Sequence, residues 1–248
     1  MKSLLYLLLI VICFITEAFS QETPLSPENH SVNVNLVKNE KSDLSWFMIQ
    51  DTLKIELGKV HTEVKKIEDT LYVITRINTK QSSTQWIDST IVEIPNFKPL
   101  YHSSYNQQRE MVLKFGEKVT GYYLDKKTGT KNDISEETTA PYFDSNFYPQ
   151  LIRWLPLEEG YANTIKIFDY NPTAKIGTMT ATIKEVSSAT MNLKQKEIAV
   201  WKVEVTDDIS DNTAISTYYI DQNTRKILQQ DIDFRGRKMS MELIEARN

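Results

Sequence analysis

The chain has 248 residues, of which 40% are hydrophobic, 10% aromatic and 25% charged, and its formal net charge is -4. This composition excludes a disordered tail, a collagen-like or low-complexity chain and a multi-pass membrane protein. A mildly acidic chain also lacks the overall positive charge typical of nucleic-acid binders, so we expect no nucleic-acid partner.

The N-terminus has the pattern of a secretory signal peptide. Lys2 precedes an unbroken apolar run over residues 4–15, and the small residues Ala18 and Ser20 favour cleavage after residue 20. The run is too short to cross a bilayer as a helix, which needs about 20 apolar residues. We therefore expect residues 1–20 to be a signal peptide, and the exported chain to lie in the periplasm or cell envelope without a membrane span.

Cys13 is the only cysteine, so the mature chain contains none. Lipidation of Cys13 is not expected, because Ile12 is too large for the position before a lipoprotein cleavage site. Without cysteine there is no disulfide, no thiol catalysis, no thiolate zinc site and no iron–sulfur cluster. A domain of this size can bury about 70% of its unfolded surface, so an apolar core alone can hold it.

Residues 21–43 are polar, contain Pro24 and Pro27, and predict a mobile leader before a single β domain over residues 44–246. The clearest strand covers residues 178–184, because apolar and polar side chains alternate along it. Similar stripes recur elsewhere, and polar turns at 125–129 and 221–224 separate them. We predict a mainly β fold: a curved antiparallel sheet, or incomplete barrel, of about ten or eleven strands.

Residues 145–155 differ from this pattern. Phe147, Leu151 and Trp154 share one helical face, Pro149 suits a first helical turn, and Pro156 ends the segment. We predict a short amphipathic helix that packs on the sheet.

Catalytic chemistry finds little support in the sequence. His30, His61 and His102 have no metal-ligand spacing, and we expect each to be a surface or hydrogen-bonded histidine. The chain has no serine-nucleophile motif and no glycine-rich phosphate loop. We therefore predict no enzyme, no catalytic residue, no metal and no cofactor.

Two acidic segments and one basic turn leave alternatives open. Residues 207–212 offer oxygens for calcium but lack the loop glycine and the closing glutamate, so a solvated hairpin turn is favoured. Asp231 and Asp233 alternate along a strand, as paired glycosidase carboxylates might be arranged, but a solvated stripe is favoured. The basic turn around Gly236 is favoured as a solvated turn, with an acidic headgroup or a protein partner as the alternative; its candidate partner-binding residues are Arg235, Arg237 and Lys238.

The remaining signal is apolar and aromatic. Methionine adapts to irregular shapes, so inward stripes rich in it suit apolar ligands, although core packing is the alternative. A curved sheet with one covering helix leaves room for a cavity between them. The candidate ligand-binding residues are Met111, Phe115, Phe147, Trp154, Met179, Trp201, Met239 and Met241.

Five segments, at 94–106, 115–123, 143–149, 218–221 and 236–239, resemble an uncharacterised family of exported bacterial envelope proteins with no assigned activity. The resemblance covers about residues 70–245. The strand–turn–strand unit over residues 219–234 is more distantly similar to the periplasmic lipoprotein carriers of the LolA and LolB type. That resemblance implies an incomplete antiparallel barrel whose concave face holds acyl chains beneath helices, and no catalytic set.

Three functions follow from this reading. The first is a non-enzymatic envelope protein that binds an apolar or acylated ligand, such as a lipid, in the concave face. The second is an interaction or assembly factor for an envelope protein. The third, least favoured, is a glycan hydrolase that uses Asp207, Asp211, Asp231 and Asp233.

Overall fold

The computed structural model describes residues 23–193 and 195–244, which form one open sheet of 15 strands. The predicted mainly β class and the curved, incomplete barrel are confirmed, but the strand count exceeds the ten or eleven predicted. The predicted signal peptide and Cys13 lie outside the described residues.

The elements follow one another with short connections. The 3₁₀ helices are η1 (Val34–Leu36) and η2 (Asp208–Ser210), and the α-helix is α2 (Tyr148–Ile152). The strands are β1 (Glu40–Gln50), β2 (Leu53–Ile67), β3 (Thr70–Thr79), β4 (Trp86–Glu93), β5 (Pro99–Tyr105), β6 (Arg109–Phe115), β7 (Lys118–Asp125), β8 (Thr130–Glu137), β9 (Phe143–Asp144), β10 (Asn163–Tyr170), β11 (Ile176–Leu193), β12 (Lys196–Asp207), β13 (Ala214–Asp221), β14 (Ile227–Phe234) and β15 (Arg237–Leu243).

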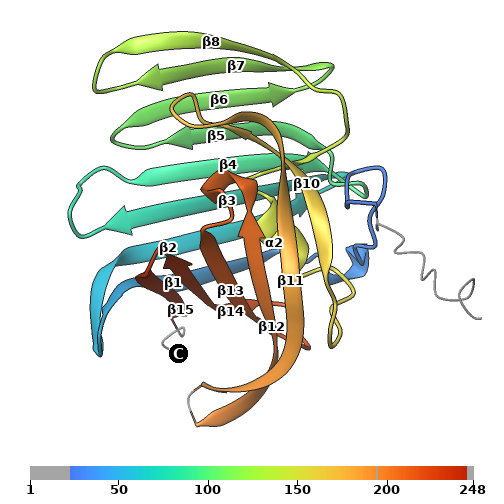
Figure 1. The fold of residues 1–248 in the computed structure, drawn as a ribbon, viewed down its shortest axis with the longest axis vertical. Coiled ribbons are helices and arrows are strands. Elements are labelled where there is room, and N and C mark those ends of the chain that lie inside the picture. Colours follow the sequence, from blue (N-terminus) through green and yellow to red (C-terminus); the bar gives the residue numbers. More distant parts are fainter. Residues whose placement is uncertain (1–22, 194, 245–248) are drawn as a thin grey trace, which may run out of the picture.

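The sheet consists of two meanders joined through their first and last strands. The order is β8 to β1, then β15 to β9, and β1 pairs with β15 at the junction (Figure 1). The pairs are antiparallel except β9 with β10, which are parallel. Hairpins explain this order, because neighbours in the sequence pair directly through short turns.

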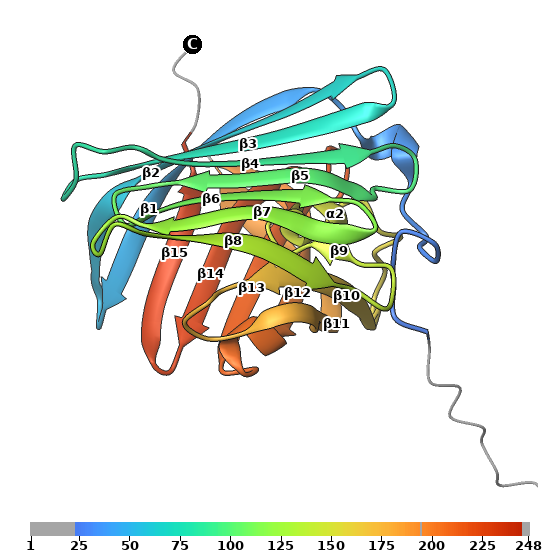
Figure 2. The same ribbon diagram turned by 90° about the horizontal axis from the view of Figure 1, so that it is seen from above.

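The two ends of the sheet overlap, so the molecule is a roll. Ile165 and Ile167 of β10 face the main core, whereas Phe168 and Tyr170 pack with side chains of β6–β8 in a second apolar cluster. Strand β10 is thus covered on both faces. Seen from above, the layer of β5–β8 lies across that of β10–β15 (Figure 2).

Helix α2 lies inside the roll. It is shorter than the predicted 145–155 segment: Phe147 precedes it, and residues 153–155 form a turn. Phe147, Leu151 and Trp154 are fully buried, and Phe147 and Trp154 stack around Phe97 at centroid distances of 5.8 and 6.1 Å. The helical face predicted from the sequence is therefore part of the core.

Residues 23–39 differ from the expected polar leader, because they pack on the fold. Leu25 pairs with Ile165 of β10, and Leu25, Val32 and Val37 are buried. His30 contacts the ring of Phe97 at 5.6 Å. The apolar residues spaced through this polar segment anchor it, and the sheet begins at residue 40 instead of 44. Within residues 23–244, the structure contains no helix that is both long and apolar enough for a membrane span.

Candidate ligand chamber inside the rolled sheet

A chamber of about 310 Å³ lies between helix α2 and the inner faces of β1–β4, β14 and β15. Ligand sites generally occupy about 300–1,000 Å³, so a small ligand fits this volume. Helix α2 fills only one end of the roll, and the chamber is the space that remains beside the helix. Phe147 and Trp154 are part of the core, whereas Pro149 and Gln150 line the chamber.

One wall of the chamber is a row of polar side chains, which we call the polar row. The strand register places Ser42 opposite Thr62, Thr62 opposite Thr75, and Thr75 opposite Asp88. All four line the chamber, and the row continues to Ser104 of β5, which is fully buried. Cross-strand partners share a face, so the row faces the interior throughout.

Next to the polar row runs an apolar row. Leu44 lies opposite Val60, Val60 opposite Ile77, and Ile77 opposite Trp86. These four residues also line the chamber. The same wall therefore offers hydrogen-bonding groups along one row and hydrocarbon along the next.

The polar row ends in a hydrogen-bonded corner. The indole Nε1–H of Trp86 donates to Oδ1 of Asp88 at 2.8 Å and lies 3.3 Å from Oγ of Ser104. The Nη2 of Arg109 also donates to Ser104 at 3.2 Å. These bonds fix Trp86 and Asp88 in the chamber wall.

The opposite wall contains a buried ion pair. Arg153 follows α2 and is 2% exposed; its Nη1 lies 2.6 Å from Oε1 of Glu40 and 3.1 Å from the carbonyl oxygen of Arg225. Its guanidinium also lies 4.7 Å from the ring of Trp154. Burial lowers the pKa of Arg153, and the charge of Glu40 opposes that shift. Glu40 is therefore needed to stabilise the charge of Arg153.

Behind the chamber, a polar network joins β9, at one end of the sheet, to β4 and β5 of the first meander. His102 Nδ1 of β5 lies 3.0 Å from Oδ1 of Asp144 on β9, and Thr90 Oγ1 of β4 donates to Oδ2 of Asp144 at 2.7 Å. Asn146, which lines the chamber, donates from Nδ2 to Thr90 at 3.0 Å and from its backbone to Asp144 at 3.3 Å. We call this set the seam network.

Burial and charge oppose each other at His102. Burial lowers its pKa, but the carboxylates of Asp144, Asp88 and Asp169 raise it more, so the net shift is upward. Burial raises the pKa of Asp169, while the hydrogen bond from Ser145, at 2.6 Å, opposes this. His102 is buried and links β5 to β9 through Asp144. It is therefore a hydrogen-bonded histidine, which is one of the two environments expected from the sequence.

The structure distributes the eight candidate ligand-binding residues over several places. Met241 lines the chamber. Phe147, Trp154, Met179 and the partly buried Trp201 belong to the main core. Met111 and Phe115 of β6 belong to the second apolar cluster. Met239 lines a separate hollow of about 480 Å³ near the β14–β15 turn.

The basic turn is the β14–β15 hairpin. Arg235, Gly236, Arg237 and Lys238 are exposed, and the guanidinium of Arg235 lies 5.2 Å from the ring of Phe234. No metal-binding group of three or more His, Cys, Asp or Glu side chains occurs in the part of the chain that the structure describes.

The four candidate hydrolase carboxylates are engaged locally. Asp207 accepts a hydrogen bond from Tyr148 at 2.8 Å, and Asp211 pairs with Lys175. The other two act along β14: Asp231 accepts from Gln229 and Ser240, and Asp233 accepts from the backbone of Gly236.

Sequence reasoning missed the polar row and the seam network. The signal for the row was weak but present: Thr62 sits between Val60 and Val64, so one strand face reads apolar, polar, apolar. His102 and Asp144 are 42 positions apart, and only the pairing of distant strands brings them together.

An open, rolled, β-barrel-like sheet with a chamber inside defines the class of this protein. The chain belongs to the family described as protein of unknown function (DUF3108), whose model matches residues 41–242. This agrees with the expected family without assigned activity. A solved structure, the β-barrel-like protein of domain of unknown function DUF1849 from Brucella abortus, is similar in fold, with 9% identity and a TM-score of 0.52. The match covers 84% of this chain and 96% of that chain. No curated protein matches this chain.

Proposed function

We propose that the protein is a non-enzymatic, exported binding protein of the cell envelope that holds a small amphipathic ligand in the chamber. The observation that carries the proposal is the chamber itself, enclosed by two sheet halves and α2 and walled by adjacent polar and apolar rows. A ligand that is apolar on one side gains from burial against Leu44, Val60 and Ile77, at about 25 cal/mol for each Å² of apolar surface covered.

The sequence supports the setting of this function. The signal-peptide pattern over residues 1–20 indicates export. The distant resemblance to the LolA and LolB carriers supports an acylated ligand, and we propose that the two groups share the principle of a half-barrel around a ligand. A volume of about 310 Å³ holds only part of a long acyl chain, so the ligand enters the chamber with one end.

The test is to fill the chamber. Met241→Trp places a larger side chain in the chamber. Glu242→Trp, the next residue along the same strand and on its opposite face, places one in the separate hollow. Protein purified from a bacterial envelope is examined by native mass spectrometry for co-purified small molecules. We expect bound mass in the wild type and Glu242→Trp, and its loss in Met241→Trp. An apo mass in the wild type, together with no uptake of octyl-chain amphiphiles, would contradict the proposal.

A second proposal is an assembly role for the β14–β15 turn. Its exposed Arg235 and Arg237 favour an acidic partner surface. Charge reversal at both positions should abolish pull-down of an envelope partner, whereas reversal of the exposed Lys65 and Lys66 on β2 should not. Pull-down unaffected by the Arg235 and Arg237 changes would remove this turn as the contact.

A further inference from the structure

On β2 and β3 the polar row runs between apolar side chains. On one side of it lie Val64 and Val73, which are buried in the main core, and on the other lies the apolar row. Thr62 is buried, and Ser42 and Thr75 are half-buried. A ligand that displaces water from these hydroxyls must supply hydrogen-bond partners to them, because burying a hydroxyl without a partner costs free energy. Thr62 and Thr75 are 3.4 Å apart through their Oγ1 atoms, which satisfies only part of their capacity.

From this row we infer that the chamber recognises a hydroxyl-rich group, that is a saccharide, either free or carried on a lipid. The inference rests on the ligand-binding function proposed above and names the chemistry of its ligand. The two rows together define which groups the ligand must present: hydroxyls toward Thr62, Thr75 and Asp88, and carbon–hydrogen surface toward Ile77 and Trp86. A pyranose ring carries both, with hydroxyls around its rim and carbon–hydrogen bonds on its faces.

The charges of the chamber argue against an acidic ligand. Arg153 is already paired with Glu40 at 2.6 Å, and Asp88 adds a carboxylate to the polar row. Lys226 lines the chamber as well, so the four charged groups of the lining sum to zero. An anion at the polar row would meet the carboxylate of Asp88 without an unpaired buried cation to offset it.

The uncharged groups of the chamber both donate and accept hydrogen bonds. The amides of Gln150, Gln230 and Asn146 line it beside the polar row. A cationic ligand would donate to Asp88 but could not accept hydrogen bonds from the donors of the lining. A ligand hydroxyl can donate to one group of the lining and accept from another.

The test compares probes that differ only in the polar group. Isothermal titration calorimetry of the mature protein uses octyl β-D-glucoside, octanol and octanoate below micelle-forming concentrations, with glucose as the free-saccharide probe. We expect octyl glucoside to bind at least tenfold more tightly than octanol or octanoate. Glucose binding on its own would assign a free saccharide, and binding of octyl glucoside alone would assign a lipid-linked one.

Isosteric variants locate the recognition. Thr75→Val and Thr62→Val should each weaken octyl glucoside about fivefold, since each removes one net hydrogen bond. Octanol should be unaffected or bind more tightly. Thr75→Ser, which keeps the hydroxyl, should retain affinity, and Thr120→Val on the exposed face of β7 is the matched control.

Failure of the saccharide inference and failure of the proposed ligand-binding function give different results. Equal binding of octanol and octyl glucoside, unchanged in both valine variants, would overturn the saccharide inference and leave the ligand-binding function in place. Preference for octanoate would also overturn it. If the folded wild type bound none of the four probes, both the inference and the proposed function would fall.

Discussion

Replacing Asp144 by Asn tests whether the seam network holds the roll together. Asp144 is fully buried and accepts hydrogen bonds from Thr90 at 2.7 Å, from His102 at 3.0 Å and from the backbone of Asn146 at 3.3 Å. The asparagine keeps the size of the side chain but removes its charge. The imidazolium of His102 then loses its nearest opposite charge in a buried site.

The magnitude follows from the burial of both partners. Removing one member of a buried ion pair costs about 3–5 kcal/mol, because the other charge is left uncompensated. The net pKa of His102 is raised in the folded state, against the lowering effect of burial, so its charge stabilises the fold fully below about pH 6.5. That contribution is lost as the pH rises through the folded pKa. We therefore expect Asp144→Asn to cost about 3–5 kcal/mol at pH 6 and distinctly less at pH 8.5.

Urea denaturation followed by tryptophan fluorescence measures this difference at both pH values. His102→Gln is the control background: in it, Asp144→Asn should have a cost that no longer depends on pH. A cost that is the same at pH 6 and pH 8.5 in the wild-type background would refute the reasoning, since it would mean that the charge of His102 does not change between these two pH values.

Three further predictions concern stability. Glu40→Gln should destabilise the fold by about 3 kcal/mol by urea denaturation, because Arg153 stays charged and buried; adding Arg153→Met should restore most of the loss, and no restoration would contradict the ion-pair reading. Gly121→Ala should lower the melting temperature, because a Cβ there would lie 1.8 Å from a backbone oxygen and overpacking costs about 1–3 kcal/mol; Gly116→Ala, with 3.7 Å of room, should be nearly neutral. Trp154→Ala should cost about 3–5 kcal/mol, since the ring is fully buried in the core; a cost below about 1 kcal/mol would place the ring outside it.

The sequence predicts the second meander better than the first. The alternation of Met179, Ala181 and Ile183 is correct, because the outward face of β11 carries threonines that mark it clearly. Strands β1 and β2 are harder to delimit, since lysines and glutamates on their solvent face resemble loop composition.

The candidate site is less accessible to prediction. Each member of the polar row looks like an ordinary solvent-facing polar residue within its own strand, as Thr75 does between Ile74 and Arg76. Its interior position depends on the register of four strands and on the direction of the roll. Pro149 locates the start of the helix correctly, but the helix ends at Ile152, well before Pro156.

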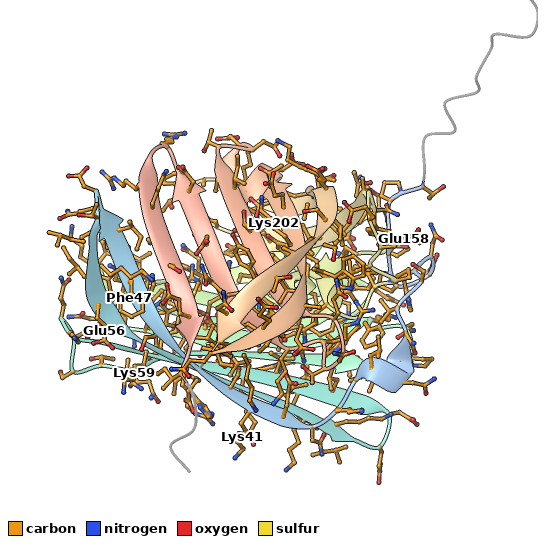
Figure 3. The ribbon with its side chains drawn as sticks, turned by 90° about the horizontal axis from the view of Figure 1, so that it is seen from below. Lys41, Phe47, Glu56, Lys59, Glu158 and Lys202 are labelled. Carbon is orange, nitrogen blue, oxygen red and sulfur yellow. The ribbon has the colours of Figure 1, made fainter. Side chains whose placement is uncertain are left out.

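The overlap at β10 has a mechanical consequence. A closed barrel has a circumference fixed by its strand number and shear, since hydrogen bonds run all the way round. Here the strand order ends at β8 and β9, and the overlap is held by side chains such as Phe115 against Phe168, at 6.0 Å between ring centroids. Figure 3 shows the other flank, where the β1–β2 hairpin with Phe47 and Glu56 stands beside β13–β15. The width of this roll therefore depends on side-chain packing and on the seam network, and not on a continuous ring of backbone hydrogen bonds.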